Sequence, residues 1–295
     1  MKRMLLIMNP FAGQRKVNRY LVDILTLFNR ADYAVEVYMT AGSGDAIHVA
    51  EEKAASVDLI VCCGGDGTFN ETVTGIHRSG VDVPVGYIPG GSTNDFAASL
   101  QLSLDPLQAA RDIVEGTPVA YDLGRFGDRY FTYVASFGAF TRVSYATPQN
   151  IKNSLGHAAY LLSSMQELPQ VRNSHVRMEI DGEIVEDDFI FGAICNSTSV
   201  GGVLTLDPRQ VDMRDGLFEI LLVRMPRNLT EVTEGIQAIQ NQPYNCSMMT
   251  FRSAREVKVW PEPDMAWTLD GERADGQEEI TVENLHMAIR LMQRE

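Results

Sequence analysis

Eight consecutive residues, Gly64-Gly65-Asp66-Gly67-Thr68-Phe69-Asn70-Glu71, combine the residue types that bind a phosphate and a cation. They follow the apolar run Leu59–Cys63, which predicts a buried parallel strand, and they lead into a predicted helix over 69–78. Glycines let backbone N–H groups approach phosphate oxygens, and the start of a helix adds a favourable dipole. The Asp66 carboxylate would repel a bare phosphate, so it indicates a bridging Mg²⁺, as in phosphoryl transfer. Two glycines alone could serve a tight turn, but the whole octet is hard to explain in that way.

A second glycine-containing loop stands in the same relation to the next predicted strand. The loop Pro89-Gly90-Gly91-Ser92-Thr93-Asn94-Asp95-Phe96 follows the apolar run Val85–Ile88. Taken alone, it is equally compatible with a simple helix cap. Because the carboxyl ends of parallel strands meet at one edge of a sheet, we expect it to form a second wall of the same crevice. Asn9-Pro10 and Thr40 end the first two predicted strands, so the four strand ends together predict a nucleotide site.

The spacing of apolar residues divides the chain into two domains. In residues 1–124, strands are predicted at 4–8, 35–39, 59–63 and 85–88, and helices at 16–30, 45–55, 69–78 and 105–115, the second with Asp45 as its N-cap. This alternation predicts an α/β domain with a parallel sheet. In residues 125–295, strands are predicted at 129–137, 175–180, 188–195, 217–223, 257–260, 265–269, 279–282 and 287–291, and helices at 151–167 and 229–240. Asp181-Gly182 predicts a hairpin turn, so we expect a mostly antiparallel β-sandwich or barrel.

Both loops, the opening Asn9-Pro10 and a late Asp270-Gly271-Glu272 resemble the soluble bacterial diacylglycerol kinases and the related sphingosine and ceramide kinases. The resemblance runs through the whole chain in order and spacing. It implies a nucleotide domain like that of phosphofructokinase and NAD kinase over 1–124, and a lipid-substrate β-sandwich over 125–295. It also implies an active site in the cleft between the two domains.

The resemblance further implies roles for individual residues. ATP would be held by Asn9, Pro10, Thr40, Gly64, Gly65, Asp66, Gly67, Thr68, Asn70, Glu71, Gly91, Ser92 and Asn94. Asp66 would act on the catalytic Mg²⁺. Glu272 would be the general base for the lipid hydroxyl, alone or with Asp270. A second, structural Mg²⁺ would be bound by Asp212, Asp215 and Leu217, although this stretch could also be only a turn before a strand.

The second loop departs from the family pattern at two positions. Gly90 and Ser92 stand where the family has Leu and Thr in a Pro-Leu-Gly-Thr sequence. Serine keeps the hydroxyl, so a phosphate contact survives. The missing leucine side chain is expected to change the packing beside the nucleotide.

Charge and composition restrict the partners and the compartment. The chain has 295 residues, 45% of them hydrophobic, and a net charge of −14, which excludes a general nucleic-acid binder. The longest apolar runs are too short to span a membrane, and the four cysteines show no metal spacing, which is typical of free thiols in a reducing compartment. We therefore expect a cytoplasmic protein, peripheral at the inner face of the cell membrane through its lipid substrate.

Residues 125–177 form a basic island in this acidic chain. Its basic side chains are Arg125, Arg129, Arg142, Lys152, Arg172 and Arg177, against only two acids. The island could be an ordinary solvated face. It could also contact an anionic bilayer, and we take Lys152, Arg172 and Arg177 as the candidates for that contact.

Several functions stay open beside the diacylglycerol kinase expected here. The acceptor could be another lipid, such as a sphingoid base, a monoacylglycerol or phosphatidylglycerol. The protein could be an NAD kinase or a catalytically silent lipid-binding regulator. A homodimer is left open. The lack of a Gx₄GK[ST] sequence and of HRD or DFG elements excludes P-loop NTPases and protein kinases.

Overall fold

The computed structural model describes residues 1–15, 17–138, 173–200, 204–241, 244–262 and 265–294. The chain forms two compact units. The first comprises Met1–Asp122 together with Met287–Glu295, and the second comprises Leu123–His286. The end of the chain thus returns to the first unit, whereas the sequence-based division kept all of 125–295 in the second domain.

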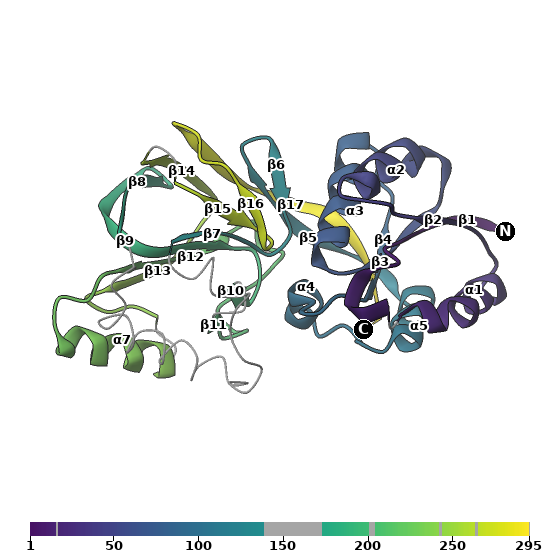
Figure 1. Cartoon of the computed structure of the whole chain (residues 1–295), viewed down its shortest axis with the longest axis horizontal. Coiled ribbons are helices and arrows are strands. Elements are labelled where there is room, and N and C mark those ends of the chain that lie inside the picture. Colours follow the sequence, from purple (N-terminus) through teal and green to yellow (C-terminus); the bar gives the residue numbers. More distant parts are fainter. Residues whose placement is uncertain (16, 139–172, 201–203, 242–243, 263–264, 295) are drawn as a thin grey trace. The chain divides into compact units, whose positions relative to one another are not determined.

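The first unit is built on a parallel sheet (Figure 1). Strands β1 (Lys2–Met8), β2 (Tyr33–Met39), β3 (Leu59–Gly64) and β4 (Val85–Pro89) are arranged in the order β4-β3-β1-β2. The last strand, β17 (Ile280–Gln293), adds to β4 in parallel through Leu291. The helices are η1 (Ala12–Arg15), η2 (Val17–Tyr20), α1 (Leu21–Arg30), α2 (Asp45–Lys53), η3 (Ala54–Ser56), α3 (Asp66–Ser79), α4 (Asp95–Ser99) and α5 (Pro106–Glu115). The predicted alternation of strands and helices is confirmed.

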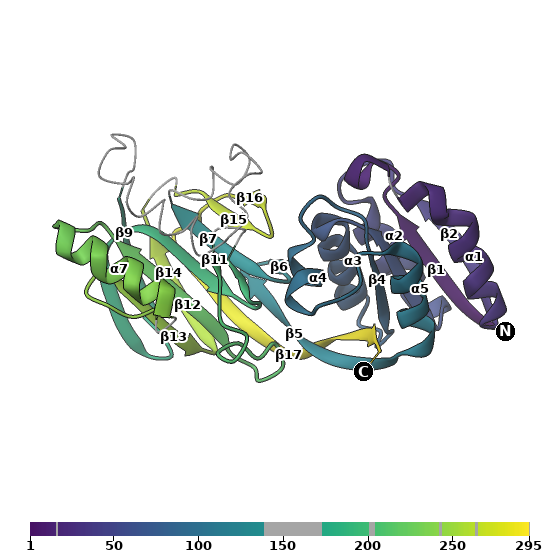
Figure 2. The same ribbon diagram turned by 90° about the horizontal axis from the view of Figure 1, so that it is seen from below.

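Helices cover both faces of this sheet because successive side chains of a strand point to opposite sides. On one face, Met4, Leu6 and Met8 of β1 pack in a cluster with residues of α1 and α5. On the other face, Leu5 and Ile7 pack with residues of α2. Figure 2 shows α1 and α5 together beside β1. The central strands are therefore buried on both sides, which explains their continuous apolar runs.

The start of α2 differs from its prediction by one residue. Gly44, in a left-handed conformation with φ of 86°, is the N-cap, and Asp45 is the first helical residue. The Asp45 carboxylate accepts hydrogen bonds from the backbone N–H groups of Ala41 and Gly42, at 2.6 and 3.1 Å. Asp45 therefore holds the turn that precedes the helix instead of capping the helix itself.

The second unit is a mostly antiparallel β structure. Its strands are β5 (Thr117–Phe126), which begins in the first unit, β6 (Arg129–Phe131), β7 (Val134–Gly138), β8 (Ser174–Ile180), β9 (Glu183–Cys195), β10 (Ser199–Val200), β11 (Leu204–Thr205), β12 (Phe218–Arg224), β13 (Met249–Ala254), β14 (Glu256–Pro261), β15 (Trp267–Leu269), β16 (Glu272–Ala274) and the first part of β17. β9 pairs with β8 along one stretch and with both β7 and β12 along another. The core contains Trp267, which packs against Phe126 and Phe137.

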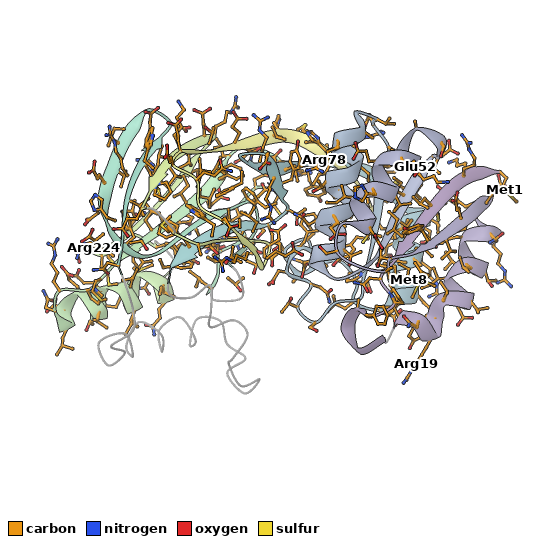
Figure 3. All side chains as sticks on the ribbon, turned by 45° about the horizontal axis from the view of Figure 1, so that its top comes forward. Met1, Met8, Arg19, Glu52, Arg78 and Arg224 are labelled. Carbon is orange, nitrogen blue, oxygen red and sulfur yellow. The ribbon has the colours of Figure 1, made fainter. Side chains whose placement is uncertain are left out.

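Helix α7 (Leu229–Asn241) confirms the helix predicted at 229–240. It is tied to β12 by an ion pair in which Arg224 donates to both carboxylate oxygens of Glu231, at 3.1 and 2.9 Å. Figure 3 labels Arg224 close to α7. The hairpin predicted at Asp181-Gly182 is also confirmed, since both residues have positive φ between β8 and β9. The helix predicted at 151–167 lies outside the described residues.

Two strand predictions for residues 125–295 are wrong in their boundaries. The predicted strand 129–137 is split into β6 and β7, because the backbone at Thr132 and Tyr133 bonds to a distant carboxylate. The predicted strands 279–282 and 287–291 are one strand, β17, which continues through Met287 with a φ of 54°. Within the described residues, no helix has the length and hydropathy that a membrane span requires.

Candidate active site

The carboxyl ends of β1, β2 and β3 bring three predicted nucleotide-binding residues together. The backbone N–H of Asn9 donates to the Cys63 carbonyl at 2.9 Å, and that of Thr40 donates to the Met8 carbonyl at 2.9 Å. The side-chain amide of Asn9 donates to Thr68 Oγ1, at 3.2 Å. Parallel pairing thus places Asn9 beside the first turn of α3, as expected from the strand order.

The two glycine-containing loops touch through their backbones. The N–H of Gly90 donates to the Gly64 carbonyl at 2.7 Å. A Cβ on Gly91 would lie 2.6 Å from Gly65 Cα, closer than real Cβ atoms come to any heavy atom. The close approach of the loops therefore requires glycine at position 91, and a Cβ on Gly65 would make a tight contact of 3.2 Å with Gly91 Cα. The two loops form one surface at the N-terminus of α3, where N–H groups and the helix dipole favour a phosphate.

Asp66 joins these two loops through its carboxylate. It is the first residue of α3, with only 7% of its surface exposed. One oxygen accepts from the N–H of Phe96 at 3.2 Å, and the other accepts from the N–H of Asp95 at 3.1 Å and from Thr93 Oγ1 at 3.4 Å. The carboxylate therefore satisfies the N-terminus of α4.

Asn94 shapes the second loop from within. It is the N-cap of α4, in a left-handed conformation with φ of 54°. Its Oδ1 accepts from the Gly91 N–H at 2.8 Å, and its Nδ2 donates to the Gly91 carbonyl at 3.1 Å. Both ends of the amide are thus used inside the loop, and Ser92 is held exposed at its tip. Asn94 positions the loop, whereas Ser92 is available to a ligand.

Glu71 has a different set of contacts from the one expected of a nucleotide ligand. One of its oxygens accepts from the Gly44 N–H at 2.7 Å and from Ser43 Oγ at 3.1 Å. The other accepts from the Ala46 N–H, at 3.3 Å. Glu71 therefore caps α2 from α3 and fixes the loop that follows Thr40.

The structure accounts for the glycine at position 90, where the family has leucine. A Cβ there would lie 3.0 Å from Val17 Cγ2. A Cβ on Gly13 would in turn lie 1.9 Å from the Gly90 carbonyl oxygen. Gly13 and Val17 thus pack directly against residue 90 of this loop.

In the second unit, Asp270 is buried and fully engaged. Its side chain accepts from the N–H groups of Thr132, Tyr133 and Val134, at 2.6, 3.0 and 3.0 Å, and from Thr132 Oγ1 at 2.8 Å. Burial raises the pKa of the Asp270 carboxyl, while these hydrogen bonds act in the opposite direction. The contacts make Asp270 the group that holds the break between β6 and β7.

Glu272 differs from Asp270 in exposure although the two are only two residues apart. The turn between β15 and β16 has Asp270 and Gly271 at φ of 49° and 85°. Glu272 begins β16 with its side chain 55% exposed. Its carboxylate lies 3.8 Å from the guanidinium of Arg129, which also donates to the Arg273 carbonyl at 2.9 Å. Of the two predicted bases, Glu272 is the one that a substrate can reach.

Comparison with known proteins shows two matched families and a set of full-length relatives. The diacylglycerol kinase catalytic domain family matches residues 3–126, and the YegS C-terminal NAD kinase β-sandwich-like domain matches residues 134–293. The diacylglycerol kinase of Bacillus subtilis (strain 168) is 33% identical over 274 residues, which cover 92% of this chain and 90% of that one. The diacylglycerol kinase of Staphylococcus carnosus (strain TM300) is 32% identical, with 92% and 89% covered. The chain belongs to the diacylglycerol kinase family. It is a lipid kinase of that type.

The fold of this lipid kinase agrees with solved structures. The crystal structure of a diacylglycerol kinase from Bacillus anthracis str. Sterne superposes with a TM-score of 0.74 over 99% of this chain and 97% of that one, at 22% identity. Another structure from the same organism gives a TM-score of 0.80 at 24% identity, with the same coverage. The α/β unit followed by a β-sandwich-like unit is the fold expected from the resemblance.

The predicted structural metal site of the kinase lies in a turn before β12. Asp212 Oδ1 accepts from the Arg214 N–H at 3.1 Å, and Asp215 Oδ1 accepts from the Leu217 N–H at 2.9 Å. In the described part of the chain, no three or more His, Cys, Asp or Glu side chains are grouped as metal ligands. A cation here would therefore need backbone carbonyl oxygens and water as well as the carboxylates, a donor set that suits Mg²⁺.

A buried acid beside this turn was missed by the sequence analysis. Glu219 on β12 is only 2% exposed, and its carboxylate accepts a long hydrogen bond from Ser253 Oγ, at 3.5 Å. Burial, together with the charges of Asp215 and Asp212, raises its pKa to about 8. The available signal was an acidic residue in the otherwise apolar stretch Leu217–Val223. Its negative neighbours make this part of the surface favourable to a cation.

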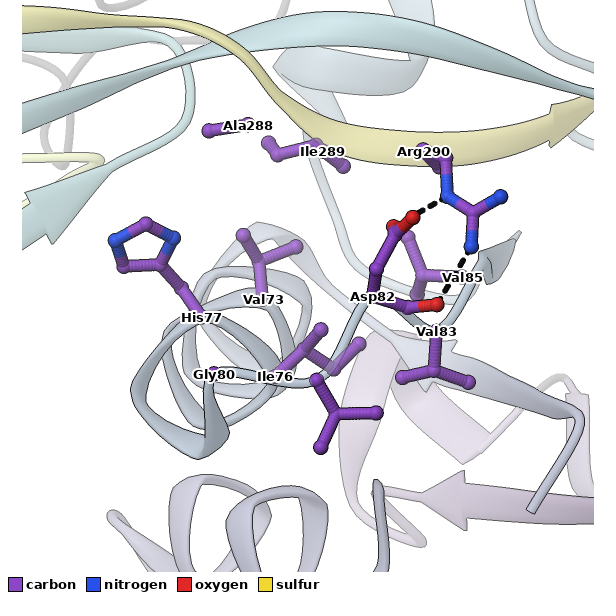
Figure 4. Close-up of a pocket in the computed structure, with 11 residues that line it drawn as sticks. Val73, Ile76, His77, Gly80, Asp82, Val83, Val85, Ala288, Ile289 and Arg290 are labelled. Atoms are coloured by element: carbon purple, nitrogen blue, oxygen red, sulfur yellow. Dashed lines mark hydrogen bonds and ion pairs between the residues drawn. The ribbon is translucent and has the colours of Figure 1, made fainter. Parts of the chain in front are cut away.

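A cavity of about 250 Å³ lies in the first unit (Figure 4). It is lined by the apolar side chains of α3 and β4 and by the end of β17, with His77, Asp82 and Arg290 among the lining residues. Arg290 donates from Nε to Asp82 Oδ1 at 2.5 Å and from a terminal nitrogen to the Asp82 carbonyl at 2.6 Å. None of the predicted site residues lines it, so we do not assign it to the reaction.

The basic residues of the island 125–177 that the structure describes are engaged with acids. Arg125 pairs with Glu283, and Arg129 lies near Glu272 as above. Arg177 Nε lies 3.9 Å from Glu186, and its guanidinium lies 5.4 Å from the centre of the Trp260 ring. The other three basic residues of the island, Arg142, Lys152 and Arg172, lie outside the described residues.

Proposed function

We propose that this lipid kinase transfers the γ-phosphoryl group of ATP, bound with Mg²⁺, to the free hydroxyl of diacylglycerol and so forms phosphatidic acid. The main support for ATP binding comes from Asp66, the first residue of α3, because its carboxylate links the two glycine loops. The names of the curated relatives, which align over nine-tenths of the chain, support the acceptor.

The glycine loops would bind the phosphates through backbone N–H groups. Gly65, Gly67 and the first turn of α3 present these groups without side chains in the way. Ser92 would add a hydroxyl from the second loop, and Asn9 and Thr40 would bind the nucleotide from the ends of β1 and β2. Mg²⁺, when bound beside Asp66, would neutralise charge on the phosphates.

Glu272 would accept the proton of the lipid hydroxyl. As the hydroxyl oxygen forms its bond to the γ-phosphorus, the bond from that phosphorus to the bridging oxygen breaks and ADP leaves with the bonding pair. The proton moves to a carboxylate oxygen of Glu272. Arg129, 3.8 Å away, would orient this carboxylate. Asp270 would act indirectly, through the turn that presents Glu272.

A phosphate-transfer assay tests this function directly. Labelled γ-phosphate is followed from ATP, with Mg²⁺, into a panel of diacylglycerol, monoacylglycerol, a sphingoid base and phosphatidylglycerol in mixed micelles, with NAD as a soluble acceptor. We expect label in phosphatidic acid, lost in Asp66→Ala and retained in Asp23→Ala, a change on the exposed part of α1. Label in another acceptor would contradict the proposed substrate. No label anywhere, with ATP still bound, would favour a regulator.

The basic island is proposed to dock the kinase on anionic membrane. The island has a net positive charge in a chain of −14, and each basic residue near an anionic surface contributes about 1 kcal/mol. Charge reversal at Lys152, Arg172 and Arg177 should abolish sedimentation with phosphatidylglycerol-containing vesicles at low salt. Unchanged sedimentation would refute this role of the island.

A further inference from the structure

Asn284 on β17 links the predicted structural metal turn, residues 212–217, to the last strand. Its Nδ2 donates to the Leu217 carbonyl oxygen at 2.9 Å. Its backbone N–H donates to the Arg255 carbonyl at 3.1 Å, which fixes the residue in the sheet. The side chain is therefore held with its amide beside the Leu217 carbonyl, the only oxygen that this predicted metal ligand can offer to Mg²⁺.

The other end of the same amide has no donor. Asn284 is 9% exposed, and among the described residues none donates a hydrogen bond to its Oδ1. A buried carbonyl-type oxygen without a partner costs about 1–3 kcal/mol, so such atoms usually have a ligand or a role. The amide orientation is set by the Leu217 carbonyl, which would be repelled by an oxygen in the Nδ2 position.

The turn also lies against β17 at a second point. A Cβ on Gly216 would lie 3.2 Å from Nδ1 of His286 and 3.5 Å from the Arg255 guanidinium. Asn284 and His286 are two residues apart and so lie on the same face of the strand. The turn 212–217 therefore packs along this face of β17, where the turn contributes the carboxylates of Asp212 and Asp215 and the strand contributes the neutral oxygen of Asn284.

We propose that Asn284 is a positioning residue of the structural Mg²⁺ site. Through Nδ2 it holds the Leu217 carbonyl in place, and through Oδ1 it supplies one more neutral oxygen to the cation and its hydration shell. Bound Mg²⁺ would then fasten the turn 212–217 to β17. This inference rests on the proposed lipid kinase function, whose family resemblance implies the structural Mg²⁺ site, and it adds a residue outside the predicted ligands Asp212, Asp215 and Leu217.

Metal binding is measured by calorimetric titration of the whole protein with MgCl₂, and by Mn²⁺ relaxation enhancement. Substitution Asn284→Leu keeps the volume but removes both polar atoms, and we expect the dissociation constant of the site to rise tenfold to a hundredfold, as for residues that orient metal ligands. Asn245→Leu is the matched control. The Asn245 amide exchanges two hydrogen bonds with the backbone of Phe251, and this change should leave metal affinity unaltered.

Hydrogen exchange of the unsubstituted protein tests the link without any dependence on how Asn284→Leu folds. Mg²⁺ should slow exchange of amides in both 215–219 and 282–286, and Asp215→Asn should abolish this protection. Protection confined to 215–219, or unchanged Mg²⁺ affinity in folded Asn284→Leu, would overturn the role of Asn284. The two proposals can fail separately. If Mg²⁺ affinity depends on residue 284 but the protein phosphorylates no lipid, the role of Asn284 is supported and the proposed function is refuted.

Discussion

Gly65 Cα lies 2.6 Å from the position that a Cβ on Gly91 would occupy, so the two glycine loops meet backbone to backbone. Each loop follows a different strand, and their contact depends on the parallel pairing of β3 with β4. The surface proposed to bind phosphate is therefore formed by two segments about 25 residues apart.

Substitution Gly91→Ala should disturb this contact. The added Cβ would also lie 2.8 Å from Asn94 Oδ1, so the loops must separate. We expect the free energy of unfolding to fall by about 1–3 kcal/mol, as for other overpacked sites, and ATP to bind at least tenfold more weakly. Urea unfolding and ATP titration measure the two effects. Gly42→Ala is the control, because a Cβ there meets nothing within 4 Å, and equal behaviour of the two variants would refute the argument.

Substitution Glu71→Gln should loosen the start of α2. The glutamine amide cannot accept at both ends, so it leaves either Gly44 or Ala46 without its acceptor. The free energy of unfolding should fall by about 1–3 kcal/mol, with faster hydrogen exchange at residues 44–47. Glu51→Gln, at an exposed position of α2, serves as the comparison. Normal exchange at 44–47 in Glu71→Gln would show that the cap is unimportant.

Substitution Asp270→Asn should act mainly on stability. An amide supplies only one acceptor where four donors now converge, and its NH₂ group would face backbone N–H groups. We expect a loss of about 1–3 kcal/mol in the free energy of unfolding, from the unsatisfied donors. Chemical denaturation checks this. An Asp270→Asn protein of normal stability would contradict the structural role.

Substitution Glu272→Gln should act mainly on catalysis and hardly on stability. The side chain is more than half exposed, so stability should change by less than about 0.5 kcal/mol. If Glu272 is the base, kcat should fall by about 10²- to 10⁴-fold while ATP affinity stays unchanged. Steady-state kinetics with lipid micelles and ATP titration measure both. Wild-type kcat would exclude Glu272 as the base.

His175 should titrate above its ordinary range. Hydrogen bonds with Asp188 first, at 2.8 Å, and then with Glu186, at 3.4 Å, raise its pKa above the usual value near 6.5. The folded state then binds the proton more tightly. The resulting stabilisation is complete below about pH 6.5 and is lost as pH rises through the folded-state pKa. NMR of the imidazole should show a raised midpoint that Asp188→Asn lowers, and an unmoved midpoint would refute the assignment.

Much of the fold follows from local patterns. The parallel strands of the first unit are predicted by continuous apolar runs such as Leu59–Cys63, because both faces of that sheet are covered. Most helices follow from their apolar spacing. The predicted boundaries of strands are wrong where a side chain from a distant part of the chain ends the strand. The predicted strand 129–137 is divided because Asp270, 138 positions beyond Thr132, takes the N–H groups that a continuous strand would use.

The sequence alone was enough to predict a glycine-rich phosphate site, because glycines and an aspartate between a strand and a helix are typical of such sites. The resemblance to the lipid kinases added the pair of late carboxylates, Asp270 and Glu272. It did not determine which carboxylate does what. Asp66 is tied to the second loop, Glu71 to α2, and Asp270 to the β6–β7 break, while Glu272 is left accessible. Only the tertiary structure decided these roles, because each depends on hydrogen-bond donors that belong to segments far away in the chain.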